Sequence, residues 1–292
     1  MTHLSHNEQF HQAILCKDVA LAKDLLAQGC DVDWKGKYHM TSLHVAAHVG
    51  SAPLLQLLLD HGATADAQDS SGYTALHFIV FADRGEIDGN LIQILSRAGA
   101  NLDLGDREGA TALHAAFSNR SYELIRVLAD LGAKLDARDI QGRTPIMHLL
   151  DKPRPMQVEL SLLNLVATSH GQDNLGRDVM HHAAASGHDK ICQHLNALGF
   201  GLDVQDHEGN TPIMLAAKAM HYDTIKTLVD LGADYSIPNH EGAMPLDQPW
   251  KSPSMAQHLL QLHEAAITKR EAREIEQQTQ NSCTQTRPKT RI

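Results

Sequence analysis

Apolar residues between Thr111 and Gly142 follow a helical spacing twice in succession, with a polar break between the two runs. The first run is short and carries mainly small or apolar residues, namely Leu113, Ala115, Ala116 and Phe117. The second run forms a broad apolar stripe, made of Leu124, Ile125, Val127, Leu128 and Leu131. Thr111 is suited to cap the first helix, and Gly132 is suited to end the second. The pattern predicts two short antiparallel helices followed by an extended turn.

The same pattern recurs along almost the whole chain. Equivalent first residues stand at Thr41, Thr74, Thr111, Thr144, Asp178, Thr211 and Met244, and a further copy opens near Glu8. A fixed period of about 33 residues is typical of stacked repeats. A single helix pair cannot bury its apolar face alone, so the copies must pack on one another.

Three short motifs show that the repeat resembles the ankyrin repeat. Its Thr-Pro-Leu-His signature is echoed by TALH at Thr74–His77 and Thr111–His114, a Gly-Ala turn follows the second helices, and an Asp-x-x-Gly tip recurs, as at Asp106–Gly109. The resemblance implies an all-α ankyrin-repeat solenoid of paired antiparallel helices with protruding β-hairpin-like turns. It also implies that five histidines bond the local backbone and the capping threonine, namely His11, His44, His77, His114 and His181.

Departures from the repeat suggest where the chain divides. We expect an N-terminal capping repeat over 1–40, further repeats and a C-terminal cap over 41–267, and a frayed helix end with a disordered tail over 268–292. About four residues are inserted within 82–90, where a surface loop tolerates them. The Thr144 copy is the least regular, because it carries Pro153 and Pro155 and lacks the Gly-Ala turn. A longer closing helix is expected over about 254–278.

Composition and charge limit the kinds of partner that the chain is expected to bind. The net charge is −10, and the tail from Thr279 contributes three positive charges, so the remainder carries −13. Such a body repels a phosphate backbone and attracts a basic protein. We therefore expect a protein partner, no nucleic acid and no membrane, and a monomeric solenoid. Four cysteines without paired spacing and a polar N-terminus favour the cytoplasm.

The twenty histidines are candidates for metal binding or acid–base chemistry. His181, His182, His188 and Cys192 form the most metal-like group, but the expected burial of Cys192 favours a structural role. The chain shows no nucleophile elbow, no phosphate-binding glycine loop and no zinc-protease motif. We therefore expect no catalytic residues, no metal and no cofactor, and a protein that is not an enzyme.

Ankyrin proteins usually bind partners on the concave surface of hairpin tips and first helices. Carried over to this chain, the resemblance implies a partner-binding groove that includes Tyr38, His48, Tyr73, Phe81, Arg107, Asn119 and Arg143. Aromatic residues near arginine are typical of interface hot spots. The alternative is that Phe81 packs on a neighbouring helix and the tyrosines only shield the hairpins.

Two functional hypotheses follow. The favoured one is a non-enzymatic protein-binding module that acts as a scaffold, inhibitor or adaptor. The other is a translocated bacterial effector that uses its repeats to bind a host protein, because the polar segment Arg270–Gln278 is similar to the C-terminal segments of such effectors. A secretion assay with and without residues 268–292 would separate them.

Overall fold

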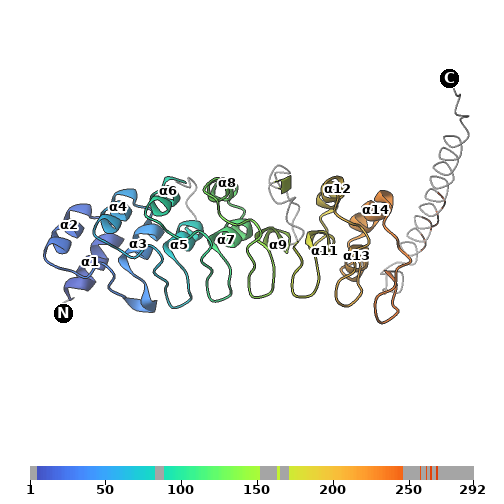
Figure 1. The fold of residues 1–292 in the computed structure, drawn as a ribbon, viewed down its shortest axis with the longest axis horizontal. Helices are drawn as coiled ribbons and strands as arrows, with labels where there is room; N and C mark the ends of the chain where they lie inside the picture. The colour runs from blue at the N-terminus through green and yellow to red at the C-terminus, as the bar shows by residue number, and fades with distance from the viewer. Residues whose placement is uncertain are drawn as a thin grey trace, which may run out of the picture. The chain divides into compact units, whose positions relative to one another are not determined.

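The computed structural model describes residues 5–82, 89–151, 163–164 and 171–245, together with Gln257, Gln261, Glu264 and Thr268. The chain divides into two compact units, Met1–Leu149 and Leu150–Ile292. In the described residues, both units contain helices and turns and no strand (Figure 1). The all-α class expected from the repeat pattern is confirmed. The division falls within the Thr144 copy, where the repeat pattern is least regular.

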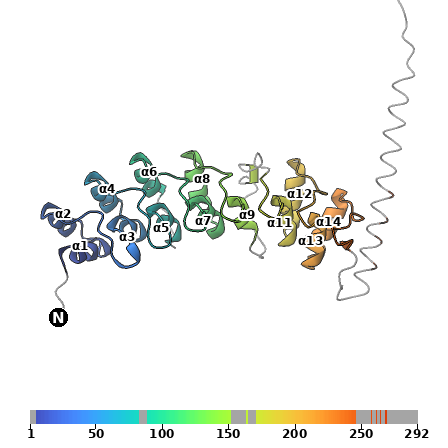
Figure 2. The ribbon, with the colours of Figure 1, turned by 60° about the horizontal axis from the view of Figure 1, so that its bottom comes forward.

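The first unit stacks helix pairs in two rows. The first helices of the pairs are α1 (His6–Leu15), α3 (Ser42–Val49), α5 (Ala75–Phe81), α7 (Ala112–Asn119) and α9 (Pro145–Leu150). The second helices are α2 (Val19–Ala27), α4 (Ala52–Asp60), α6 (Gly89–Arg97) and α8 (Tyr122–Asp130). Successive members of each row from α1 to α8 contact one another, and the hairpin turns project beyond the row of first helices (Figures 1 and 2).

The second unit repeats this arrangement. Its described helices are α11 (Val179–Ala185), α12 (Asp189–Ala197), α13 (Pro212–Lys218) and α14 (Tyr222–Leu231). The first helices α11 and α13 pack together, as do the second helices α12 and α14.

The core of both units consists of equivalent residues from successive repeats. One position of the described second helices is a buried leucine in each case, at most 4% exposed, as seen at Leu25, Leu58, Leu95, Leu128, Leu195 and Leu228. The first helices contribute buried alanines, such as Ala46, Ala116, Ala183 and Ala216. Small side chains allow close approach between neighbouring first helices, so branched leucines can fill the space behind them. The predicted apolar stripes are therefore the core.

Four repeats, those that begin at Thr41, Thr74, Thr111 and Asp178, are joined to the next hairpin through a buried histidine. In α7, the N–H of Thr111 donates to Nδ1 of His114 at 3.1 Å, and Nε2 of His114 lies 3.1 Å from the carbonyl oxygen of Arg143 in the following hairpin. Because Nδ1 accepts, the proton is on Nε2, which donates to Arg143. Burial lowers the pKa of His114 to about 4, so the ring is neutral.

The same bridge occurs at three other histidines. Nε2 of His44, His77 and His181 lies 2.9–3.2 Å from the carbonyl oxygens of Tyr73, Ala110 and Asn210. At His181 the N-cap residue is Asp178, and Nδ1 donates to its Oδ1 at 2.7 Å. His11 is the exception, and the expectation for it is wrong. Ser5 and Glu8 form a capping box, so α1 begins at His6, one turn earlier than its counterparts. His11 consequently lies inside the helix, where no N-cap residue is available to its ring.

Hairpin tips form a ladder with one backbone bond between neighbours. In the first unit the N–H groups of Ser70, Arg107 and Ile140 donate to the carbonyls of Tyr38, Ser71 and Glu108 at 2.8–3.1 Å. In a regular tip, Oδ1 of Asp69 also accepts from the N–H groups of Ser71 and Tyr73, both at 2.8 Å. The tip ends at Gly72, whose φ of +84° favours glycine.

The first hairpin, residues 31–40, is closed by the same backbone hydrogen bond as the others but has a different backbone conformation at its tip. Gly36 N–H donates to Met40 O at 2.9 Å, matching the bond from Asp69 to Tyr73. However, Tyr38 and His39 have φ values of +59° and +58°, and His39 occupies the position of Gly72. Left-handed backbone costs about 1–2 kcal/mol at a residue with a side chain. The first tip is therefore strained.

Some expectations fall outside the described residues. These are most of the insertion within 82–90, most of the irregular segment after Asp151 and the tail over 279–292. Four residues of the predicted closing helix are described, and all four are helical and exposed, namely Gln257, Gln261, Glu264 and Thr268. The domain boundaries therefore remain predictions.

The leucine core gives a first prediction. Leu128 is 0% exposed, whereas Arg107 is an exposed tip residue. Leu128→Ala should cost roughly 2–5 kcal/mol because it leaves a cavity, and Arg107→Ala should change stability by less than about 0.5 kcal/mol. Urea unfolding followed by circular dichroism measures both, and the reverse ranking would contradict the repeat register.

The strained tip gives a second prediction. His39→Gly should stabilise the chain by about 0.5–1 kcal/mol, because relief of the left-handed strain exceeds the entropy that glycine adds to the unfolded state. Gly72→Ala is the matched control and should destabilise, because its Cβ would lie 2.7 Å from the backbone nitrogen of Arg107. Urea unfolding is the measurement, and destabilisation by His39→Gly would refute the strain.

Candidate functional site

An aromatic cluster occupies the row of first helices beside the second hairpin. Three rings form it, those of Tyr73, Phe78 and Phe81. Tyr73 meets Phe81 edge-on with ring centroids 4.9 Å apart, and it meets Phe78 at 6.4 Å. Imidazoles surround these rings, with His48 at 6.2 Å and His44 at 5.3 Å from Phe78. Neighbouring repeats thus supply one contiguous aromatic surface.

This aromatic cluster is only partly covered. Phe81 is 39% exposed at the last residue of α5, and His48 is exposed in the last turn of α3. Tyr73 is half-buried, and burial together with Asp106 and Asp69 raises its pKa. Its hydroxyl therefore keeps its proton at neutral pH and can donate a hydrogen bond. The cluster offers an apolar surface with a polar edge.

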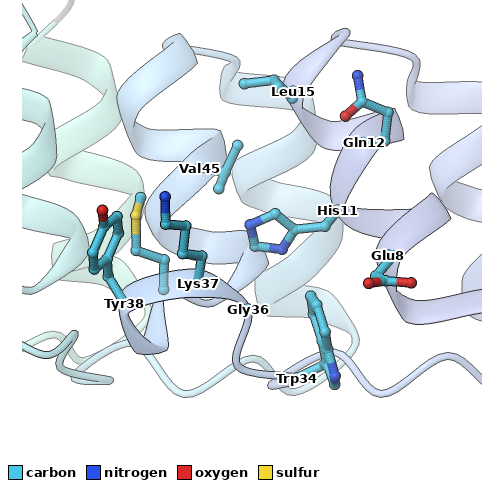
Figure 3. A pocket seen from close by; sticks show the side chains of 10 residues that line it. Glu8, His11, Gln12, Leu15, Trp34, Gly36, Lys37, Tyr38 and Val45 are labelled. Carbon is cyan, nitrogen blue, oxygen red and sulfur yellow. The ribbon is translucent and has the colours of Figure 1, made fainter. Parts of the chain in front are cut away.

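Tyr38 lies apart from this aromatic cluster. It is 61% exposed, its ring has the Lys37 ammonium 4.7 Å from its centroid, and no ring contact links it to Tyr73 or Phe81 in the part of the chain that is described. Instead it lines a pocket of about 410 Å³ between α1, α3 and the first hairpin (Figure 3). The pocket is lined by Glu8, His11, Gln12, Leu15, Trp34, Gly36, Lys37, Tyr38, Met40 and Val45.

The remaining predicted residues have different surroundings. Arg107 is exposed at its tip, and Asn119 is exposed while its Nδ2 donates to Val80 O at 3.4 Å. Arg143 is paired with Asp139, because Nε and Nη2 of Arg143 both lie 2.9 Å from Oδ2 of Asp139. A guanidinium held in this way stabilises the hairpin. Of the seven predicted residues, the structure brings together Tyr73, Phe81 and His48.

Sequence reasoning missed Phe78 and most of the pocket. Phe78 occupies the position after the bridging histidine, where equivalent residues are Val45 and Ala115. A phenylalanine at a position that is valine or alanine in these copies was the feature of the sequence that could have indicated its part in the cluster. The pocket could have been sought where the tip departs from Asp-x-x-Gly, at 36–39.

Two copies carry histidine at the position of Phe78, and there the side chain bonds a carboxylate instead of packing on other rings. Nε2 of His148 lies 2.8 Å from Oδ2 of the tip carboxylate Asp139. In the second unit, Nδ1 of His182 lies 2.8 Å from Asp151 and its Nε2 lies 3.1 Å from Asp173. Carboxylates only accept, so both nitrogens of His182 must donate. His182 is therefore an imidazolium clamped between two carboxylates.

The pKa values agree with this clamp. Burial alone would lower the pKa of His182, but its hydrogen bonds to Asp151 and Asp173 outweigh burial and raise the pKa to about 9. Burial likewise opposes ionisation of Asp173, yet the bond from His182 and backbone N–H groups lower its pKa. The three groups act as one structural ion cluster.

The metal-like group from the sequence is divided among separate roles. His181 bridges to Asn210, His182 is clamped by carboxylates, and Nε2 of His188 lies 3.2 Å from Leu150 O. Cys192 is buried, which raises its pKa to about 12. Among the described residues, no three metal-ligating side chains are grouped to hold an ion. Nor does any described helix combine the length and apolarity needed to cross a membrane.

Comparisons with known proteins agree with the architecture. Three copies of a family model for ankyrin repeats match residues 10–87, 78–152 and 157–239. The ankyrin repeat, SAM and basic leucine zipper domain-containing protein 1 of Mus musculus is 44% identical over 59 residues, which is 20% of this chain and 12% of that protein. The neurogenic locus Notch protein of Drosophila melanogaster is 48% identical over 61 residues, or 20% of this chain and 2% of that protein. The chain matches a small part of each relative.

The His182 clamp gives a third prediction. The pKa of His182 in the folded chain is about 9, above the ordinary value of 6.5. The clamp therefore stabilises the folded state fully below pH 6.5, and this stabilisation is lost as pH rises through 9. His182→Gln should lower the free energy of unfolding by on the order of 2 kcal/mol at pH 6 and by much less at pH 10. NMR titration of His182 with urea unfolding at both pH values tests this. An ordinary pKa, or an equal cost at both values, would contradict the clamp.

Proposed function

Because the chain belongs to the ankyrin-repeat family, whose repeats are generally protein–protein interaction modules, we propose that it binds a partner protein through the aromatic cluster of its second and third repeats. In this proposal the chain holds its partner and catalyses no reaction, as a scaffold, inhibitor or adaptor does.

The observation that carries the proposal is the exposure of Phe81 within an ordered aromatic cluster. Phe81 is 39% exposed although Tyr73 packs edge-on against it at 4.9 Å. A phenylalanine serving only the core would be buried, as Phe117 is at 0% exposed. Rigid rings already held by neighbours bury apolar area on binding with little loss of side-chain entropy. These are the features of an interface hot spot.

Charge supports a partner with a basic surface. The chain carries a net charge of −10, and Asp69, Asp106 and Glu108 lie close enough to raise the pKa of Tyr73. A basic rim on the partner would be attracted, mainly through a faster association rate that added salt slows. The same field disfavours nucleic acid. Free Cys16, Cys30 and Cys192 fit the proposed cytoplasmic location, with the chain acting as a monomer.

The fourth prediction concerns this aromatic cluster. The double variant Tyr73→Ala/Phe81→Ala should bind the partner at least about 30-fold more weakly, corresponding to about 2 kcal/mol. Ile140→Ala is the control, because Ile140 is a 57% exposed tip residue outside the cluster. The partner is first identified by affinity capture and mass spectrometry, and its affinity for each variant is measured by calorimetry.

Circular dichroism must show that all variants are folded. Loss of binding confined to the double variant supports the aromatic cluster. Unchanged binding by the folded double variant would move the interface to another part of the chain, and an equal loss with Ile140→Ala would place it at the tips.

A further inference from the structure

The pocket under the first hairpin has the features of a built site, and we propose that it receives an aromatic side chain from a peptide segment of the partner protein. The proposal rests on the proposed protein-binding function and adds an anchor point outside the aromatic cluster. Four departures from the repeat pattern lie at or beside this pocket, and three of them, at His11, Gly36 and Tyr38, line it.

The first departure is Gly36, which replaces the aspartate of a regular tip. An added Cβ at Gly36 would lie 3.0 Å from Cζ3 of Trp34. A side chain at position 36 would therefore press on the indole ring from its first carbon onward. Loss of the carboxylate makes room for Trp34, which forms one wall of the pocket.

The second departure is the release of His11 from helix capping. Since α1 begins one turn early, the His11 ring projects into the pocket, where it meets Trp34 edge-on with centroids 5.6 Å apart (Figure 3). Burial and the neighbouring His44 lower its pKa, so it presents a neutral ring. His11 and Trp34 together offer an edge and a face to an incoming ring.

The other two departures lie in the tip backbone. Tyr38 and His39 both adopt left-handed conformations, and Tyr38 stands at the pocket with 61% of its surface exposed. Residues held in such strained conformations gather at binding sites, where surrounding structure maintains them. Here the neighbouring tip does so, because Ser70 N–H donates to Tyr38 O at 2.8 Å.

The chemistry of the lining selects a neutral apolar group. Leu15, Met40 and Val45 add aliphatic and thioether surface to the three rings. The charged lining residues are Glu8 and Lys37, one of each sign, so the pocket favours neither a phosphate nor a cation. Thioethers and ring edges both contact aromatic rings favourably. A volume of about 410 Å³ admits an aromatic side chain with part of the backbone that carries it.

The position of the pocket favours a peptide over a free small molecule. It opens among first helices and hairpins, as the aromatic cluster does, and the bond from Ser70 to Tyr38 joins the two hairpins. A single extended segment of the partner can therefore reach both. Gln12 and Lys37 at the pocket provide polar groups for the backbone of that segment.

Small peptides test the pocket separately from the natural partner. The probes are N-acetyl-phenylalaninamide, N-acetyl-lysinamide and the pentapeptide acetyl-Gly-Gly-Phe-Gly-Gly-amide, each titrated into the full chain. NMR shifts of the Trp34 indole N–H and the His11 ring report binding. Phenylalaninamide should give saturable shifts, lysinamide should bind at least about tenfold more weakly, and the pentapeptide should bind more tightly than phenylalaninamide.

Two leucines of the first repeat provide matched variants. Leu15 and Leu21 are 51% and 44% exposed, and only Leu15 is among the pocket residues. Leu15→Asp should weaken pentapeptide binding at least about tenfold, whereas Leu21→Asp should change it less than about twofold. Both substitutions place a charge at an exposed site, so both variants should fold.

Several results would overturn the proposal. These are an absence of shifts at Trp34, an equal affinity for lysinamide, an equal effect of both leucine variants, or weaker binding of the pentapeptide than of phenylalaninamide. The last result would identify a small-molecule site. Because these probes do not require the partner or the aromatic cluster, pocket binding can succeed or fail independently of the Tyr73→Ala/Phe81→Ala result.

Discussion

The buried imidazole bridge is the interaction on which the rest of the structure depends. At His44, His77 and His114 the ring accepts from the N-cap threonine of its own helix and donates to a carbonyl of the next hairpin, as His114 does to Arg143. One side chain thereby satisfies a helix end and fixes the register between neighbours. Because the ring is buried and neutral, the join does not depend on charge. Apolar stripes make stacking favourable, and the bridge determines how neighbouring repeats align.

A scaffold fixed in this way leaves the next position free to vary. The position after the bridging histidine, or after the methionine that replaces it at Met147 and Met214, is filled in successive copies by Val45, Phe78, Ala115, His148, His182 and Leu215. As phenylalanine it joins the aromatic cluster, and as histidine it bonds a tip carboxylate. The same backbone thus presents an apolar surface in early repeats and a charged network in later ones. Function on this fold is set by such positions, since the helices around them hardly change.

The sequence predicted what repetition determines. Helix pairs and the leucine core follow from periodic patterns, and the resemblance to ankyrin repeats implied the backbone bonding of His44, His77, His114 and His181. Failures occurred where one copy differs from the others. His11 was misassigned because the Ser5–Glu8 capping box outcompetes the usual start, and the pocket was missed because it needs Trp34 to occupy the space of an absent carboxylate. Neither Tyr38 nor its separation from Tyr73 could be placed, because the first tip takes an uncommon left-handed path.

The exceptional features of the first repeat are linked energetically. Its histidine lies 3.4 Å from Oγ of Ser42 instead of bridging to a hairpin carbonyl, its tip lacks the capping carboxylate, and Tyr38 and His39 are strained. Stacked repeats are stabilised mainly by their neighbours, so a repeat with weaker joins to the next one should open at lower free energy than the others. A side chain that fills the pocket would contact α1, α3 and the first hairpin together, because all three line it. Binding there would therefore also stabilise the first repeat, by an amount that grows with the logarithm of the partner's concentration relative to its Kd.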